Sequence, residues 1–160
     1  MGQRDDLMQA TISFLKENNY PFEVKKEDLL EITFHFPFKA LGKMAPMKEL
    51  VLFSDRDVRV IGVMPFSVPE AKRNLAAEYL MRVNYHLQSG WFSMDYNDGE
   101  VRATAERSQM EGIPSKRDMQ ILILTPTTMV AQFSSGLLLT IRGVGTPKEN
   151  AERFTPQVMK

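Results

Sequence analysis

The segment 94–101, with the sequence MDYNDGEV, gathers three acidic residues and an asparagine around one glycine. Calcium loops of the EF-hand type need oxygen ligands at positions one, three, five and nine, a glycine at six and a glutamate at twelve. A loop that starts at Asp95 places Gly99 at position five and Ala103 at position nine. Neither residue has a side-chain oxygen, so the spacing argues against a calcium site.

The same segment fits a β-hairpin that turns at Asp98 and Gly99, a residue pair typical of tight turns. In that register Asp95 faces Arg102, so the close charged pair has opposite signs. A four-residue loop over 97–100 keeps the same register. The other expected pairs are apolar: Tyr96 with Val101, Met94 with Ala103, and Phe92 with Ala105.

The two histidines are the remaining candidates for acid–base chemistry. His35 shares the polar face of a predicted strand with Glu31 and Thr33, which would suit a small-ligand site or an enzyme. A solvated histidine is the simpler interpretation. His86 falls near the end of a predicted helix, where a partly charged imidazole interacts favourably with the helix dipole. Neither histidine has a neighbour in sequence that would complete a metal site.

Other catalytic and cofactor motifs are missing from the sequence. There are no cysteines, so thiolate metal sites, iron–sulfur clusters and thiol nucleophiles are excluded. The glycines and lysine of residues 143–148 lack the strand and the Lys-Ser/Thr ending of a phosphate loop. We expect no catalytic residue, no metal and no cofactor.

The overall charge gives no reason to expect a nucleic-acid or membrane partner. The 160 residues include 20 basic and 20 acidic side chains, so the formal net charge is zero. The N-terminal residues lack the apolar segment of a signal peptide. We therefore expect a cytoplasmic protein that does not bind nucleic acid.

Hydrophobic periodicity predicts an α+β fold with an antiparallel sheet of five to six strands and three helices, in the order α-β-β-β-β-α-β-β-α. Ser67 with Glu70, and Ser115 with Asp118, resemble capping starts of the second and third helices. We expect a single domain over 1–145 and a loosely ordered tail over 146–160. The expected helices are 4–18, 67–88 and 115–141, and the strands are 22–26, 30–38, 47–54, 58–64 and two that flank 94–101.

Residues 121–141 carry no formal charge and are long enough to span a bilayer. They also include threonines, serines, a glutamine and Pro126, which is more polar material than a lone lipid-facing helix accommodates. We therefore expect a buried helix of a soluble domain and no stable membrane span. Pro126 should kink this helix or restart it.

An apolar cluster around the loop between two strands is the predicted partner-binding surface. Methionine suits such a surface because its flexible side chain adapts to many partners. The alternative is that these side chains cap the core under the last helix. The cluster consists of Phe36, Phe38, Leu41, Met44 and Met47.

The segment 68–102 resembles the YbjN-like family, whose members carry the label "putative bacterial sensory transduction regulator". The matching points are Pro69 and Glu70 at a helix start, Asn84, the run Gly90-Trp91-Phe92, Asp95, and the run 98–102, DGEVR. The resemblance extends over roughly residues 4–142. The tail after Arg142 and the uncharged helix around Pro126 depart from it.

This resemblance implies a fold similar to type III secretion chaperones, with three helices against a twisted antiparallel sheet. Such chaperones commonly form dimers and bind segments of other proteins. The family supplies no catalytic residues to carry over. We therefore expect a non-enzymatic, chaperone-like or regulatory protein that binds a protein partner or forms a homodimer. The alternative is a small-ligand binder or enzyme that uses the sheet face near His35.

Overall fold

Six strands form one antiparallel sheet in this computed structural model, which describes residues 2–38 and 43–156. The strand order across the sheet is β1-β2-β3-β4-β6-β5. The α+β class and the antiparallel sheet predicted from the sequence are confirmed. The strands are β1 (Phe22–Lys26), β2 (Leu29–Phe38), β3 (Lys43–Phe53), β4 (Asp57–Val63), β5 (Trp91–Met94) and β6 (Val101–Ser108).

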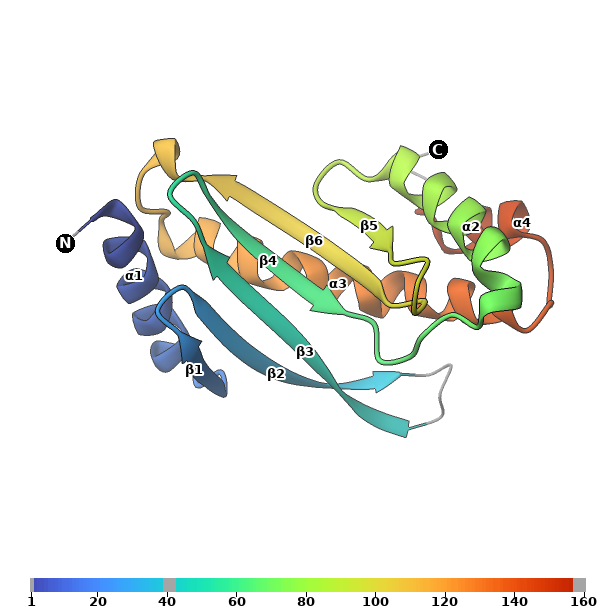
Figure 1. Cartoon of the computed structure of the whole chain (residues 1–160), viewed down its shortest axis with the longest axis horizontal. Coiled ribbons are helices and arrows are strands. Elements are labelled where there is room, and N and C mark those ends of the chain that lie inside the picture. The colour runs from blue at the N-terminus through green and yellow to red at the C-terminus, as the bar shows by residue number, and fades with distance from the viewer. Residues whose placement is uncertain (1, 39–42, 157–160) are drawn as a thin grey trace.

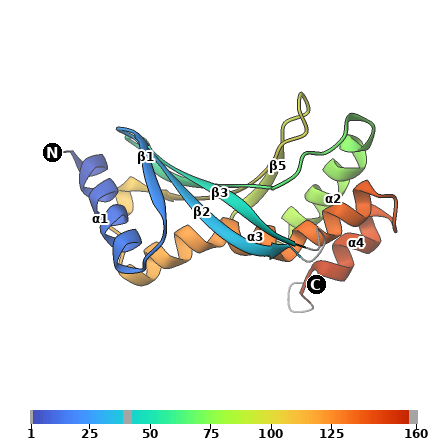
Figure 2. The same cartoon turned by 90° about the horizontal axis from the view of Figure 1, so that it is seen from below.

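The helices lie against one face and one end of this sheet. The longest, α3 (Lys116–Ile141), crosses one face of the sheet, with α1 (Gln3–Glu17) beside its start (Figure 1). Near its other end lie α2 (Arg73–His86) and α4 (Pro147–Phe154). Among the described elements, no helix covers the opposite face of the sheet (Figure 2). Two short 3₁₀ helices, Glu70–Lys72 and Gln109–Glu111, precede α2 and follow β6.

Strand β2 shows the predicted alternation between the core and the open face. Leu30, Ile32 and Phe34 are buried, whereas His35 is exposed. Successive side chains of a strand point to opposite faces, so the buried set faces α3 and the other set faces solvent.

Helix α3 is a core helix of this domain, as expected. It is long and apolar enough to cross a membrane, yet 61% of its most apolar window is buried inside the protein. It begins at Ser115, whose hydroxyl accepts a hydrogen bond from the Asp118 amide. It continues through Pro126 without a break, so the helix does not restart there.

Close packing fixes α2 against α3. The Tyr79 hydroxyl donates a hydrogen bond of 2.8 Å to the Phe133 carbonyl of α3. A Cβ atom at Gly136 would lie 2.3 Å from that hydroxyl oxygen. Glycine is therefore required at this point of α3. The start of α2 differs from the prediction, since Ser67 forms no cap and the helix begins at Arg73 after a 3₁₀ turn.

The C-terminal segment 146–160 was predicted to be a loose tail, and this is wrong for residues 147–154, which form α4. Thr146 and Glu149 form a capping box around the start of α4. Asn150 is buried and donates hydrogen bonds to the Thr140 hydroxyl and the Val144 carbonyl. The described chain thus has four α-helices rather than the three expected.

The hairpin between β5 and β6 forms, but its predicted register is wrong by two residues. Met94 pairs with Val101 and Phe92 with Ala103, so the connection spans 95–100. The longer loop is held by its own side chains, since Asp95 accepts a hydrogen bond from the Asn97 amide. A shift of two residues keeps every side chain on its expected face, because strand side chains alternate.

A buried carboxyl joins the sheet to α3. Glu49 of β3 is 0% exposed, and one of its oxygens accepts a hydrogen bond of 2.8 Å from the Thr127 hydroxyl. Its other oxygen, Oε1, has no hydrogen-bond partner among the described residues. Loss of hydration disfavours the charged form, so burial raises the pKa of Glu49 from 4.5 to about 8.

This pKa makes stability depend on pH. Between pH 4.5 and about 8 the folded protein keeps a proton on Glu49 that the unfolded chain releases. The contribution is complete below the unfolded pKa and is lost as the pH rises through the folded pKa. The free energy of unfolding should fall across this range by on the order of 5 kcal/mol.

We expect Glu49→Gln to remove this pH dependence, because the amide keeps the side chain's shape without an ionisable proton. The variant should unfold at similar urea concentrations to the wild type near pH 5, and at clearly higher ones above pH 8. Glu31→Gln, on the open face of the sheet, is the control and should keep the wild-type profile. A wild-type profile for Glu49→Gln would contradict this role.

Candidate functional site

Met47 is the one residue of the predicted partner-binding cluster whose side chain the structure describes. Met47 is 0% exposed and belongs to the core, where it pairs with Phe34 across β2 and β3. It therefore cannot contact a partner in this fold, and the prediction for this residue is wrong. Leu41 lies outside the described residues. Phe36, Phe38 and Met44 lie in β2 and β3, but their side chains are outside the described part of the structure.

On the open face of the sheet, Glu31 lies at a cavity and His35 does not. Glu31 is half-buried, and its carboxylate lies 3.4 Å from the Lys48 ammonium. The cavity has a volume of about 480 Å³. Its walls include Glu31, Lys48, Leu50, Val63, Phe66 and Glu100. The cavity therefore includes Glu31 of the predicted sheet-face site, while His35 lies four residues further along β2 and does not line it.

The acidic and imidazole groups do not converge elsewhere on a metal site. Within residues 2–38 and 43–156, no group of three or more His, Asp or Glu side chains could hold a metal ion. His86 is half-buried, and its ring packs edge-on against Tyr85 at 5.2 Å between centroids.

The solvent-facing side of α3 carries no charged residue after Asp118. A surface helix normally has charged residues on its outer face, but residues 121–141 are uncharged all round. Ile121 is 53% exposed, although other apolar residues of the same helix are buried. Between 121 and 135 the other exposed or half-buried positions follow at intervals of one or three residues: Leu124, Thr125, Thr128, Ala131, Gln132 and Ser135.

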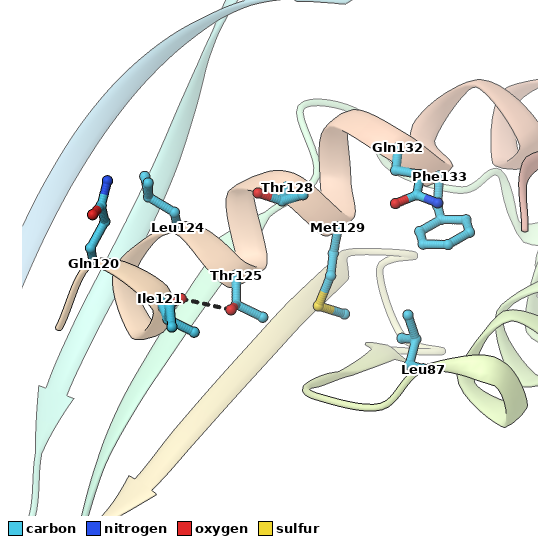
Figure 3. Close-up of a pocket in the computed structure, with 9 residues that line it drawn as sticks. All are labelled: Leu87, Gln120, Ile121, Leu124, Thr125, Thr128, Met129, Gln132 and Phe133. Atoms are coloured by element: carbon cyan, nitrogen blue, oxygen red, sulfur yellow. Dashed lines mark hydrogen bonds between the residues drawn. The ribbon is translucent and has the colours of Figure 1, made fainter. Parts of the chain in front are cut away.

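This side of α3 contains an apolar groove with a volume of about 390 Å³. Leu87, in the connection from α2 to β5, points towards Met129 and Phe133 (Figure 3). Ile121 and Thr125 lie nearer the start of α3, at the other end of the groove (Figure 3). We call this surface the α3 groove. It is lined by Leu87, Gln120, Ile121, Leu124, Thr125, Thr128, Met129, Gln132 and Phe133.

Two polar side chains of the α3 groove already have partners within the fold. The Thr125 hydroxyl donates a hydrogen bond of 2.6 Å to the Ile121 carbonyl, one turn earlier (Figure 3). The Gln132 amide donates one of 3.2 Å to the Phe154 carbonyl. Covering a polar group costs least when its hydrogen bonds are kept. Covering these two groups therefore costs little, because their hydrogen bonds stay within the fold.

The crystal structure of YbjN, described as "a putative transcription regulator from E. coli", is similar to this chain. The two share 14% sequence identity and a TM-score of 0.48, over 93% of this chain and 96% of that chain. No protein-family model matches the sequence, and no curated protein does.

Two of the residues that carried the YbjN-like resemblance, Asn84 and Gly99, have structural roles. The Asn84 side chain donates a hydrogen bond to the Phe92 carbonyl and accepts one from the Phe92 amide, which ties α2 to β5. Gly99 has a positive φ of 78°, and a Cβ atom there would lie 2.1 Å from the Val68 carbonyl oxygen. Asn84 and Gly99 therefore hold α2, β5 and the hairpin loop in position.

Sequence reasoning missed the α3 groove because it assigned the whole uncharged stretch to burial. The signal was present, since a helix packed on one side of a sheet must expose part of its circumference. Ile121 lies on the solvent side of α3 and is 53% exposed, whereas Ile123 lies in the core and is 0% exposed. The same residue type two positions apart thus gives a matched pair.

We expect Ile121→Ala to change the free energy of unfolding by less than about 0.5 kcal/mol, because the side chain is largely in solvent. Ile123→Ala removes the same atoms from the core and should cost about 2–5 kcal/mol. Urea denaturation of both variants measures the difference. Equal destabilisation would show that Ile121 is packed within the monomer and is not part of a free surface.

Proposed function

We propose that this protein is a non-enzymatic, protein-binding protein of the cytoplasm, with a chaperone-like or regulatory role, and that the α3 groove is its docking surface. The observation that supports this proposal is the uncharged outer face of α3. Packing against the sheet explains the apolar residues on the inner side of α3. It does not explain why the solvent side has no charged residue between 121 and 141.

The chemistry of the groove indicates what kind of segment docks there. Its walls combine aliphatic, aromatic and thioether groups with two threonines and two glutamines, and none is charged. A charged segment would lose hydration there without gaining an opposite charge. An uncharged helix that presents apolar side chains every three to four residues matches the length and direction of the groove.

Site-specific photo-crosslinking in cells tests this proposal. A photoreactive residue replacing Thr128, in the middle of the exposed face, should give discrete protein adducts, including any adduct with a second copy. The control position is Arg56, which is exposed in the turn between β3 and β4. Adducts should be absent or much weaker there. Equal labelling at both positions, or none at Thr128, would contradict docking at the α3 groove.

The cavity on the open face supports a second candidate, the binding of a small ligand. Its volume of about 480 Å³ falls within the range of ligand sites, and an apolar floor at Leu50, Val63 and Phe66 adjoins the paired Glu31 and Lys48. Such a pocket would suit an amphipathic molecule. His35 would play no direct part, since it does not line this cavity.

A thermal-shift screen of amphipathic small molecules would test this candidate. A true ligand at about 100 times its dissociation constant should stabilise the wild type by about 2.7 kcal/mol, a rise of several degrees in melting temperature. Leu50→Trp, which fills the cavity, should abolish the shift. Leu52→Trp, on the same face but outside the cavity, should retain it. Equal shifts in both variants would rule out this cavity.

A further inference from the structure

We propose that a cavity between α2 and α4 binds a small aromatic monoanion, a molecule with one flat ring and one carboxylate. This inference goes beyond the proposed docking function, because the cavity shares no residue with the α3 groove or with the cavity on the open face of the sheet. We call it the α2–α4 cavity.

The α2–α4 cavity lies where the two helices pack side by side (Figure 2). Its volume of about 300 Å³ is at the lower end of the range for small-ligand sites, which leaves room for one ring with a short acidic arm. Residues three or four positions apart share one face of a helix, and both helices turn such a face to the cavity. The lining residues are Met81, Arg82, Tyr85 and His86 of α2, and Lys148, Ala151 and Glu152 of α4.

Two exposed side chains of α2 form an apolar platform in this cavity. Met81 is 70% exposed and Tyr85 is 86% exposed, whereas Leu80 and Val83 of the same helix are buried. The Tyr85 ring packs edge-on against His86, with 5.2 Å between centroids, so its orientation is fixed while most of it stays uncovered. Aromatic rings pack well on tyrosine rings and on thioether groups. The platform therefore favours a ligand with a flat ring.

Arg82 provides an anion-binding group beside this platform. Its Nε atom donates a hydrogen bond of 2.8 Å to a carboxylate oxygen of Glu78, one turn earlier on α2. This bond holds the guanidinium in place, while its two terminal nitrogens have no partner among the described residues. An arginine held in this way binds a carboxylate strongly, because the fork of N–H groups matches the two oxygens.

Lys148 brings a second cation to the cavity from α4. It forms no ion pair with any residue of the described ranges, although Glu152 lies only one turn further along the same helix. Glu152 is the one acidic side chain among the described lining residues, so two permanent cations face one carboxylate. This excess suits one negative charge on a ligand. Glu152, together with Glu78 beside Arg82, disfavours a second.

The charges and the platform together exclude other classes of small ligand. A cation would approach Arg82 and Lys148, and a polyanion would approach the glutamates. An uncharged ring would cover the platform but gain nothing from the two cations. A small anion without a ring would leave Met81 and Tyr85 in water. An aromatic carboxylate uses every part of the site.

A nuclear magnetic resonance titration of the full chain with hydrocinnamate tests the proposed ligand class. Hydrocinnamate should give saturable shifts confined to amides around 81–86 and 147–154, with a dissociation constant on the order of 0.1 to 1 mM for so small a ligand. Hydrocinnamamide has the same shape without the charge, and propionate has the charge without the ring. Each should bind at least fivefold more weakly.

Variants test whether the named side chains make the site. Arg82→Gln and Lys148→Gln should each weaken hydrocinnamate binding by about fivefold or more, because each removes one cation. Lys16→Gln makes the same change of charge at an exposed position of α1, outside the cavity, and should bind like the wild type. Tyr85→Ala should weaken binding by a similar factor, whereas Tyr85→Phe keeps the ring and should retain it.

Circular dichroism of each variant establishes that it is folded before its affinity is counted. A wild type without saturable shifts around 81–86 and 147–154 would overturn the proposed site. Wild-type affinity in both Arg82→Gln and Lys148→Gln, or equal binding of hydrocinnamate and its amide, would overturn the anionic ligand. Equal binding of Tyr85→Ala and Tyr85→Phe would overturn the aromatic one. None of these outcomes bears on docking at the α3 groove, which photo-crosslinking at Thr128 tests separately.

Discussion

The hydrogen bond between Thr127 and Glu49 fixes how α3 is rotated about its own axis, and the exposed groove depends on that rotation. Thr127 must face β3 to reach Glu49, at 2.8 Å. Gly62 pairs with Glu49 in the sheet, and a Cβ atom there would lie 3.0 Å from the Pro126 Cβ atom. The sheet thus holds both Pro126 and Thr127 against its inner face. Thr128, the next residue, then faces solvent.

The ends of α3 are occupied by other helices, and only its middle is left open. Near its start, Lys116 forms an ion pair with Glu17 of α1, and Met119 contacts Thr11. Near its end, Phe133 accepts the Tyr79 hydrogen bond and Gly136 admits the ring. The α3 groove is therefore the part of the helix between α1 and α2 that the fold does not need to cover. A partner there would complete the burial of α3.

Much of the fold could be predicted because local patterns agree with it. The alternation in β2 and the cap at Ser115 required only short-range information. The register of β5 and β6 could not be predicted, because Gly99 docks on Val68 from a distant part of the chain. Helix α4 could have been predicted from Thr146 and Glu149, but the polar composition of the segment hid this signal. The predicted site failed at Met47 because alternation alone does not say which strands a helix covers.

The uniform apolarity of α3 is what made its role ambiguous from sequence. A membrane span, a core helix and a docking helix all require an uncharged segment, and hydropathy does not separate them. Individual polar side chains do. Thr127 reaches inward to a carboxyl, Thr125 bonds to its own helix, and Gln132 bonds to the Phe154 carbonyl at the end of α4. These bonds attach one side of α3 to a folded core, while Thr128 lies on the other side, which faces solvent. The inward-facing Thr127 belongs to a core helix, and the uncharged outer side is the surface that the proposed docking function uses.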